Sequence, residues 1–357
     1  MEKRCFELVR YSVAVGVMAL GLVGGCGEPL ASPDTAWRTI AVLPEGIDVV
    51  WMTTFPDAYS DTLLLLCHSS NNRVTIVSFN GTVLVEEYSY PYWGPGVTSK
   101  LRPTMIKSYR GVVWANLNSD LGESTLIVKG DALGWKEIRV PDETGIKSTC
   151  CLVPVGPDEC LFSCQVGENR TFRLGRYKNG NFSLIEPGAG YAWLIRDNAT
   201  GRIYATDFDQ ISGIALISED GGNTWIREPI DPKIVPGYEE GEAFNVYAAH
   251  DGVAYFTNGE SIVKRRGLPG EGQYKLAFLS NTGPAFHHIS DLAVAEDGAV
   301  MALGGETCVY GRGDAWVIER MPYSMVFKAI TPAPDHGFFA VATNNTFSNR
   351  VELLYHP

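Results

Sequence analysis

The chain has 357 residues, of which 45% are hydrophobic and 20% charged, and its net charge at pH 7 is −12. A chain this acidic is repelled by phosphate backbones, which excludes nucleic acid as a partner. With 38 glycines, 11% aromatic residues and no sustained helical period, the composition predicts a globular, all-β protein.

The first residues predict export. Three basic residues precede an apolar run over residues 11–23, and two glycines then lead to Cys26. Residues 1–25 therefore read as a signal peptide, which resembles that of bacterial lipoproteins and implies that Cys26 is lipidated. An ordinary signal peptide or an uncleaved anchor is the alternative. In bacterial lipoproteins the residue after the lipidated cysteine influences which membrane holds the protein. Gly27 at this position favours the outer membrane in a cell with two membranes. Residues 26–35 suit a short flexible tether.

A short apolar phrase recurs along the rest of the chain, spaced by roughly 40–50 residues. It begins after a glycine or an aspartate-containing turn in most copies. The copies are residues 61–65, 111–115, 159–162, 201–205, 252–256, 298–302 and 337–341. We interpret each copy as the second strand of a four-stranded unit. Residues 36–357 are thus predicted to form a seven-bladed β-propeller, with a six-bladed ring as the alternative.

The last unit lacks one strand. Its three strands are expected over residues 326–330, 338–341 and 350–355, where the chain nearly ends. Residues 36–42 supply the missing strand from the other end of the chain. Pairing the two ends would remove a free sheet edge, so we expect the N-terminal strand to close the last blade.

One turn carries a specific motif, SxDxGxTW, between strands expected over residues 213–218 and 224–230. Its residues are Ser218, Asp220, Gly222, Thr224 and Trp225. The motif resembles the Asp-box of sialidase-type (BNR) β-propellers, which implies a hairpin between the two outer strands of a blade. Weaker relatives occur at residues 129–135 and 311–316. The motif marks a fold rather than a chemistry.

The resemblance makes a sialidase-like glycoside hydrolase or lyase the alternative function. Sialidases need a phrase of the type RIP and a triad of arginines, and the chain has no convincing copy of the phrase. It also has no GxSxG, HExxH or phosphate-binding glycine loop, so no cofactor is predicted. A second alternative is an assembly factor for a membrane complex, although photosystem assembly factors show more Asp-box-like repeats.

Four cysteines lie within fifteen residues, on two strands joined by a turn at residues 156–158. In an exported protein this arrangement predicts a cross-strand disulfide. Cys150 with Cys164 and Cys151 with Cys160 are the two open pairings. A thiolate metal site is disfavoured because side chains alternate across a strand.

The candidate ligand-binding face is formed by loops that lead from one unit into the next. Its aromatic and histidine residues are Tyr90, Tyr92, Trp93, Tyr238, His287 and His288. Aromatic rings on a proline-stiffened loop favour binding of a glycan or a protein partner. The alternative is that Tyr90 packs between blades. Adjacent histidines point apart, so no metal site is predicted. We therefore expect a monomeric, lipid-anchored propeller that binds a ligand or acts as a scaffold.

Overall fold

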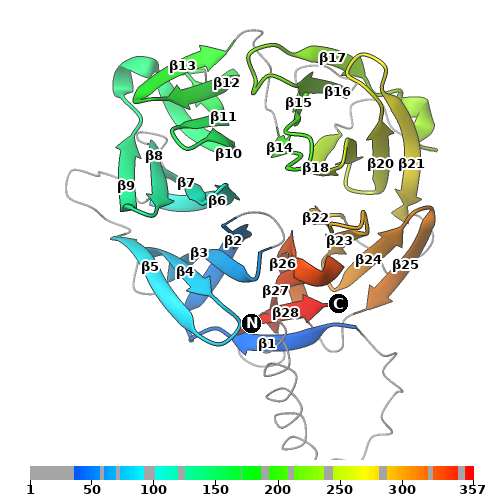
Figure 1. The fold of residues 1–357 in the computed structure, drawn as a ribbon, viewed down its shortest axis with the longest axis horizontal. Coiled ribbons are helices and arrows are strands. Elements are labelled where there is room, and N and C mark those ends of the chain that lie inside the picture. Colours follow the sequence, from blue (N-terminus) through cyan, green and yellow to red (C-terminus); the bar gives the residue numbers. More distant parts are fainter. Residues whose placement is uncertain are drawn as a thin grey trace, which may run out of the picture.

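The computed structural model describes residues 36–357, apart from the segments 57–59, 70–72, 92–100, 120–124, 170, 186–192, 208–212, 237–243, 281–287, 321–324 and 345–349. Its strands form seven antiparallel sheets of four strands each, arranged as blades in a ring (Figure 1). The fold is a seven-bladed β-propeller. The prediction of seven blades is confirmed, and the six-bladed alternative is wrong.

The blades follow one another in chain order. Blade one consists of β2 (Ile47–Phe55), β3 (Thr62–Ser69), β4 (Arg73–Phe79) and β5 (Leu84–Pro91). Blade two consists of β6 (Leu101–Tyr109), β7 (Val112–Ser119), β8 (Thr125–Asp131) and β9 (Gly134–Arg139). Blade three consists of β10 (Ile146–Gly156), β11 (Glu159–Val166), β12 (Thr171–Lys178) and β13 (Asn181–Ile185). Blade four consists of β14 (Leu194–Arg196), β15 (Ile203–Asp207), β16 (Ile214–Ser218) and β17 (Ile226–Pro229).

The remaining blades repeat this order. Blade five consists of β18 (Asn245–His250), β19 (Val253–Thr257), β20 (Ser261–Arg266) and β21 (Gln273–Leu279). Blade six consists of β22 (Asp291–Val294), β23 (Val300–Gly304), β24 (Thr307–Arg312) and β25 (Ala315–Arg320). Blade seven consists of β26 (Met325–Pro332), β27 (Phe338–Asn344), β28 (Arg350–His356) and β1 (Arg38–Val42). Short 3-10 turns occur at η1 (Asp142–Thr144), η2 (Pro232–Ile234) and η4 (Pro334–His336).

The second strand of each blade is apolar because both of its faces are buried. On β11, Leu161 packs toward blade four, whereas its neighbour Phe162 packs toward blade two. Leu64 and Leu65 on β3 divide in the same way between blades two and seven. A cluster of buried side chains fills each blade-to-blade interface. The core is therefore a ring of interfaces rather than one central mass.

The first and last strands close the ring, as predicted. β1 pairs with β28 in antiparallel register, with Arg38 opposite Tyr355. The hydroxyl of Thr39 donates a hydrogen bond of 2.8 Å to Glu352. Beside them the Trp37 indole donates to the Cys308 thiol of blade six, at 3.3 Å. Both ends of the described chain are thus held in one blade.

Candidate functional site in the central channel

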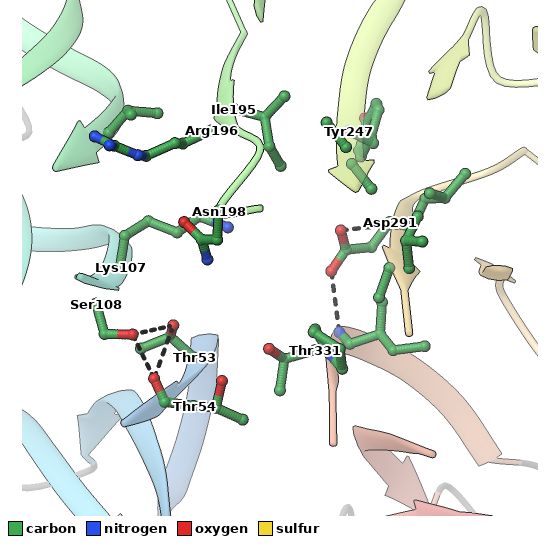
Figure 2. Close-up of a pocket in the computed structure, with 18 of the residues that line it drawn as sticks. Thr53, Thr54, Lys107, Ser108, Ile195, Arg196, Asn198, Tyr247, Asp291 and Thr331 are labelled. Atoms are coloured by element: carbon green, nitrogen blue, oxygen red, sulfur yellow. Dashed lines mark hydrogen bonds between the residues drawn. The ribbon is translucent and has the colours of Figure 1, made fainter. Parts of the chain in front are cut away.

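A pocket lies in the central channel, lined by the inner strands of all seven blades (Figure 2). The space has a volume of about 860 Å³, part of which is open to solvent. Most lining residues belong to the second halves of the inner strands, such as Thr53 and Thr54 on β2 or Thr331 on β26. The pocket therefore lies toward the end of the channel at which the inner strands finish.

Three aromatic rings from different blades pack together beside the pocket. The ring of Trp193, just before β14, stacks on that of Tyr247 of β18, with centroids 5.0 Å apart and an interplanar angle of 23°. The ring centroids of Trp193 and Trp51 of β2 are 6.4 Å apart. Trp51 and Tyr247 line the pocket, whereas Trp193 is not among the lining residues. Blades one, four and five thus build an aromatic wall inside the channel.

Lys107, on β6, places its ammonium 5.3 Å from the centroid of the Trp51 ring. It forms no ion pair or hydrogen bond with any other residue among those the structure describes. Burial lowers the pKa of this lysine, and the charges of Asp291 and Cys151 only partly oppose that effect. Lys107 is therefore a partly desolvated cation that lies over an aromatic face.

Asp291, at the start of β22, carries the channel's buried carboxylate. Its two oxygens accept backbone N–H bonds from Leu292 at 2.9 Å and Ile330 at 3.0 Å. Burial raises the pKa of Asp291 to about 6, against these bonds and the positive charge of Lys107. Burial and the Asp291 charge also raise the pKa of Tyr247. The carboxylate thus ties blade six to blade seven while facing the channel (Figure 2).

Polar groups line the rest of the pocket. The Ser108 hydroxyl donates to the Thr54 carbonyl and lies 3.3 Å from the Thr53 hydroxyl. Asn198, in the turn after β14, adds an amide. Arg196 also reaches the pocket, but Tyr109 and two backbone carbonyls hold its guanidinium. The pocket therefore offers an aromatic wall, short polar side chains and one unpaired ammonium.

The predicted ligand face is formed by the connections between blades, at the end where the inner strands begin. Tyr92, Trp93, Tyr238 and His287 lie outside the described residues. Tyr90 belongs to β5, is 8% exposed and packs in the core between blades one and two. It is therefore a core residue and not a ligand contact, because its position in the strand turns it toward the neighbouring blade.

His288 is exposed, and its imidazole lies over Gly259 so closely that a side chain there would overlap the ring. Among the described residues, no three histidine, cysteine or acidic side chains gather closely enough to hold a metal ion. His288 thus lies against the chain between β19 and β20.

The predicted disulfide is absent from the structure, where Cys150, Cys151, Cys160 and Cys164 are free thiols. Cys151 and Cys160 cannot pair, because Cys151 packs toward blade four and Cys160 toward blade two. An irregularity in the strand register places Thr149, rather than Cys150, opposite Cys164. Cys150 nevertheless lies close enough to Cys164 for its charge to raise the pKa of that thiol, so the Cys150–Cys164 pairing stays a prediction.

The turn between β16 and β17 is held by its own side chains. Asp220 accepts bonds from the backbone N–H groups of Asn223 and Thr224, at 3.0 and 2.9 Å, and from the Thr224 hydroxyl at 2.7 Å. The Ser218 hydroxyl accepts from the Gly222 N–H at 2.7 Å, where φ is +85°. These bonds hold the pKa of Asp220 at about 2. The turn lies between the outer strands of blade four, as predicted.

Arginines do not converge in the channel in the way that a sialidase site requires. Arg265 is fully buried between blades and forms a double hydrogen bond with Glu228. Arg176 binds the turn of blade four through Gly221 and Asn223. Of the described arginines, Arg196 alone lines the pocket. The described part of the chain therefore contains no arginine triad at this site.

Sequence reasoning missed the residues that dominate the channel: Trp51, Lys107, Trp193, Tyr247 and Asp291. They are spread over five blades and share no motif, so no local spacing connects them. The available signal was their position, since each lies in or beside the first strand of its unit. Polar or aromatic residues in first strands, next to the apolar second strands, would have indicated a channel lining.

No protein-family model matches the chain, and no curated protein matches it by sequence. Solved structures do resemble it. YCF48 from Cyanidioschyzon merolae superimposes with a TM-score of 0.61 at 13% identity, covering 90% of this chain and 99% of that one. The extracellular domain of the two component system BT4673 from B. thetaiotaomicron gives 0.55 at 13% identity, covering 89% of this chain and 39% of that one.

A structure from a study of two prolyl endopeptidases gives a TM-score of 0.58 at 8% identity, covering 86% of this chain and 47% of that one. Such low identities show a shared propeller fold. Among the described residues, no helix has the length and apolar character needed to cross a membrane.

Proposed function

We propose that this chain is an exported, lipid-anchored propeller that binds a saccharide in its channel pocket. The observation that carries the proposal is the presence of two aromatic rings, Trp51 and Tyr247, in the lining of a polar pocket, with Trp193 packed against both. Aromatic faces stack on the apolar faces of sugar rings, while hydroxyl and amide groups bind the ring hydroxyls. Rigid inner strands hold these groups in place, which reduces the ordering cost of binding.

Binding without turnover suits this site better than sialidase-like hydrolysis. A sialidase needs arginines around its ligand, and the one described arginine that lines the pocket, Arg196, already holds Tyr109 and two carbonyls. The turn from Ser218 to Trp225 is, on this proposal, an Asp-box that stabilises blade four. It lies between outer strands, away from the channel lining.

The test is a glycan array probed with the mature chain and with Trp51→Leu. We expect retention of a defined group of saccharides and a loss of affinity of about tenfold or more in the variant. Trp135→Leu is the matched control, because Trp135 covers Gly130 on an outer strand. If the array retains no sugar and the lipidated protein captures one subunit of a membrane complex, saccharide binding is rejected in favour of the assembly-factor alternative.

The anchor is tested separately. Cys26→Ala is expected to abolish lipid labelling with radioactive palmitate and to move the protein from the membrane to the soluble fraction. The saccharide affinity of the released protein is expected to stay the same. Unchanged labelling in Cys26→Ala would reject Cys26 as the lipidated residue.

A further inference from the structure

We infer that the ligand of the channel pocket carries a carboxylate, which binds the ammonium of Lys107 while the body of the ligand lies against Trp51. This inference rests on the proposed function, and for a saccharide it means an acidic sugar of the uronate kind. It follows from the environment of Lys107 and of the groups around it.

Lys107 lines the pocket and is partly exposed, so a ligand can reach its side chain (Figure 2). Its ammonium lies 5.3 Å from the centroid of the Trp51 ring and forms no ion pair or hydrogen bond with another described residue. Partial removal of a cation from water is costly unless an anion accompanies it, and an aromatic face offsets only a small part of that cost. The three ammonium donors therefore remain available for an incoming anion.

Asp291 is the one carboxylate among the described residues that line the pocket, and its charge partly offsets the effect of burial on Lys107. It forms no ion pair with Lys107, and its oxygens already accept the N–H groups of Leu292 and Ile330. The hydroxyls of Thr53 and Ser108 lie 3.3 Å from each other, and Ser108 donates to Thr54. A carboxylate on the ligand is thus the group that completes the site.

The placement of Trp51 further defines the ligand. Because one ring contacts the ammonium and lines the pocket, a carboxylate on Lys107 sets the atoms next to it against an aromatic face. A six-membered sugar with an exocyclic carboxylate has both parts at this short spacing. Thr53 and Asn198 are available to its ring hydroxyls.

The experiment compares neutral and acidic members of matched pairs by calorimetry, namely galactobiose with digalacturonate and cellobiose with cellobiouronic acid. We expect an acidic member to bind about ten- to hundredfold more tightly, as for a charge-assisted hydrogen bond. Lys107→Met should remove that preference. Equal binding of both members of a pair would overturn the inference and leave the proposed function standing, whereas binding of no sugar would reject both.

Lys107→Arg distinguishes a contact through charge from a structural role of Lys107. Asp291 and Cys151 are the titratable groups that act on Lys107 from β22 and β10. Because a guanidinium keeps the positive charge, Lys107→Arg should keep the preference for the acidic sugar that Lys107→Met loses. A preference that persists in Lys107→Met would contradict the inference.

Discussion

Individual residues carry large electrostatic costs in this propeller. Asp291 keeps its carboxylate in the channel lining with two backbone bonds, and Arg265 keeps its guanidinium fully buried beside Glu228. The two buried charges differ in whether an opposite charge is hydrogen-bonded to them. Asp291 has no ion-pair partner among the described residues, so its charged form is destabilised, whereas Arg265 and Glu228 share two hydrogen bonds.

Asp291 predicts a dependence of stability on pH. Its folded pKa, about 6, lies above the ordinary 3.8, so the folded state binds the proton more tightly. The ionised carboxylate destabilises the folded state fully above the folded pKa, and this destabilisation is relieved as the pH falls toward 3.8. Lowering the pH from about 7 to about 5 should therefore raise the free energy of unfolding by about 1 kcal/mol through this group. Urea unfolding of wild type and Asp291→Asn measures the difference, and parallel pH profiles would contradict it.

Glu228 predicts a large loss of stability. Removing its charge in Glu228→Gln leaves the buried Arg265 uncompensated and disturbs the bond from Tyr274 at 2.9 Å. We expect a loss of about 3–5 kcal/mol in chemical denaturation. Glu219→Gln is the matched control, since Glu219 also pairs with an arginine but has a side chain 56% exposed. A similar loss in both variants would show that burial is not the cause.

Elements in this fold divide into buried strands and self-stabilised turns. The second strands are apolar on both faces because blades pack on each side of them. The turns between outer strands rely instead on hydrogen bonds and ion pairs of their own polar side chains. Asp220 orders one turn through backbone and hydroxyl donors, while Asp314, in the same turn of blade six, pairs with Lys264 and Lys275.

This contrast predicts different effects of two alanine substitutions. Asp220→Ala leaves the N–H groups of Asn223 and Thr224 to water instead of their acceptor, and should lower the unfolding free energy by roughly 0.5–1.5 kcal/mol. Asp314→Ala removes exposed ion pairs and should change it little. Thermal unfolding gives the comparison. Saccharide binding should be unaffected in both, and a defect of binding alone in Asp220→Ala would place that turn in the ligand site.

The whole molecule depends on closure of the ring. β28 pairs with β27 on one side and with β1 on the other, so it connects the C-terminal blade to the N-terminal strand. Leu353 and Leu354 of β28 pack toward blades one and six, respectively. Without β28, two strand pairings and two interfaces are lost together.

Deleting residues 350–357 should therefore cause a cooperative loss of folding. We expect the thermal transition to fall by tens of degrees or to disappear, because both ends of the ring are released. Deleting Pro357 alone is the control, since this residue follows β28. Scanning calorimetry of both truncations tests the closure, and an unchanged transition in the longer truncation would reject it.

The fold was largely predictable from the amino-acid sequence. Doubly buried second strands leave short apolar phrases at a regular period, and tight turns such as Arg110 to Gly111 and Asp251 to Gly252 require glycine at positive φ. Counting these phrases predicted seven blades. The missing fourth strand of the last unit predicted closure by residues 36–42. Local physics determines these features, so they are visible in local sequence.

The channel site was decided by the tertiary structure alone. Trp51, Trp193 and Tyr247 are far apart in the chain, and only the closed ring brings their rings together. The same holds for Lys107 and Asp291, which come from blades two and six. Tyr90 shows the converse, because its sequence suited a binding loop while its strand position buried it. The strands and turns within a blade are determined by residues close together in the sequence. Contacts between different blades around the axis are determined by how the seven blades pack in the closed ring.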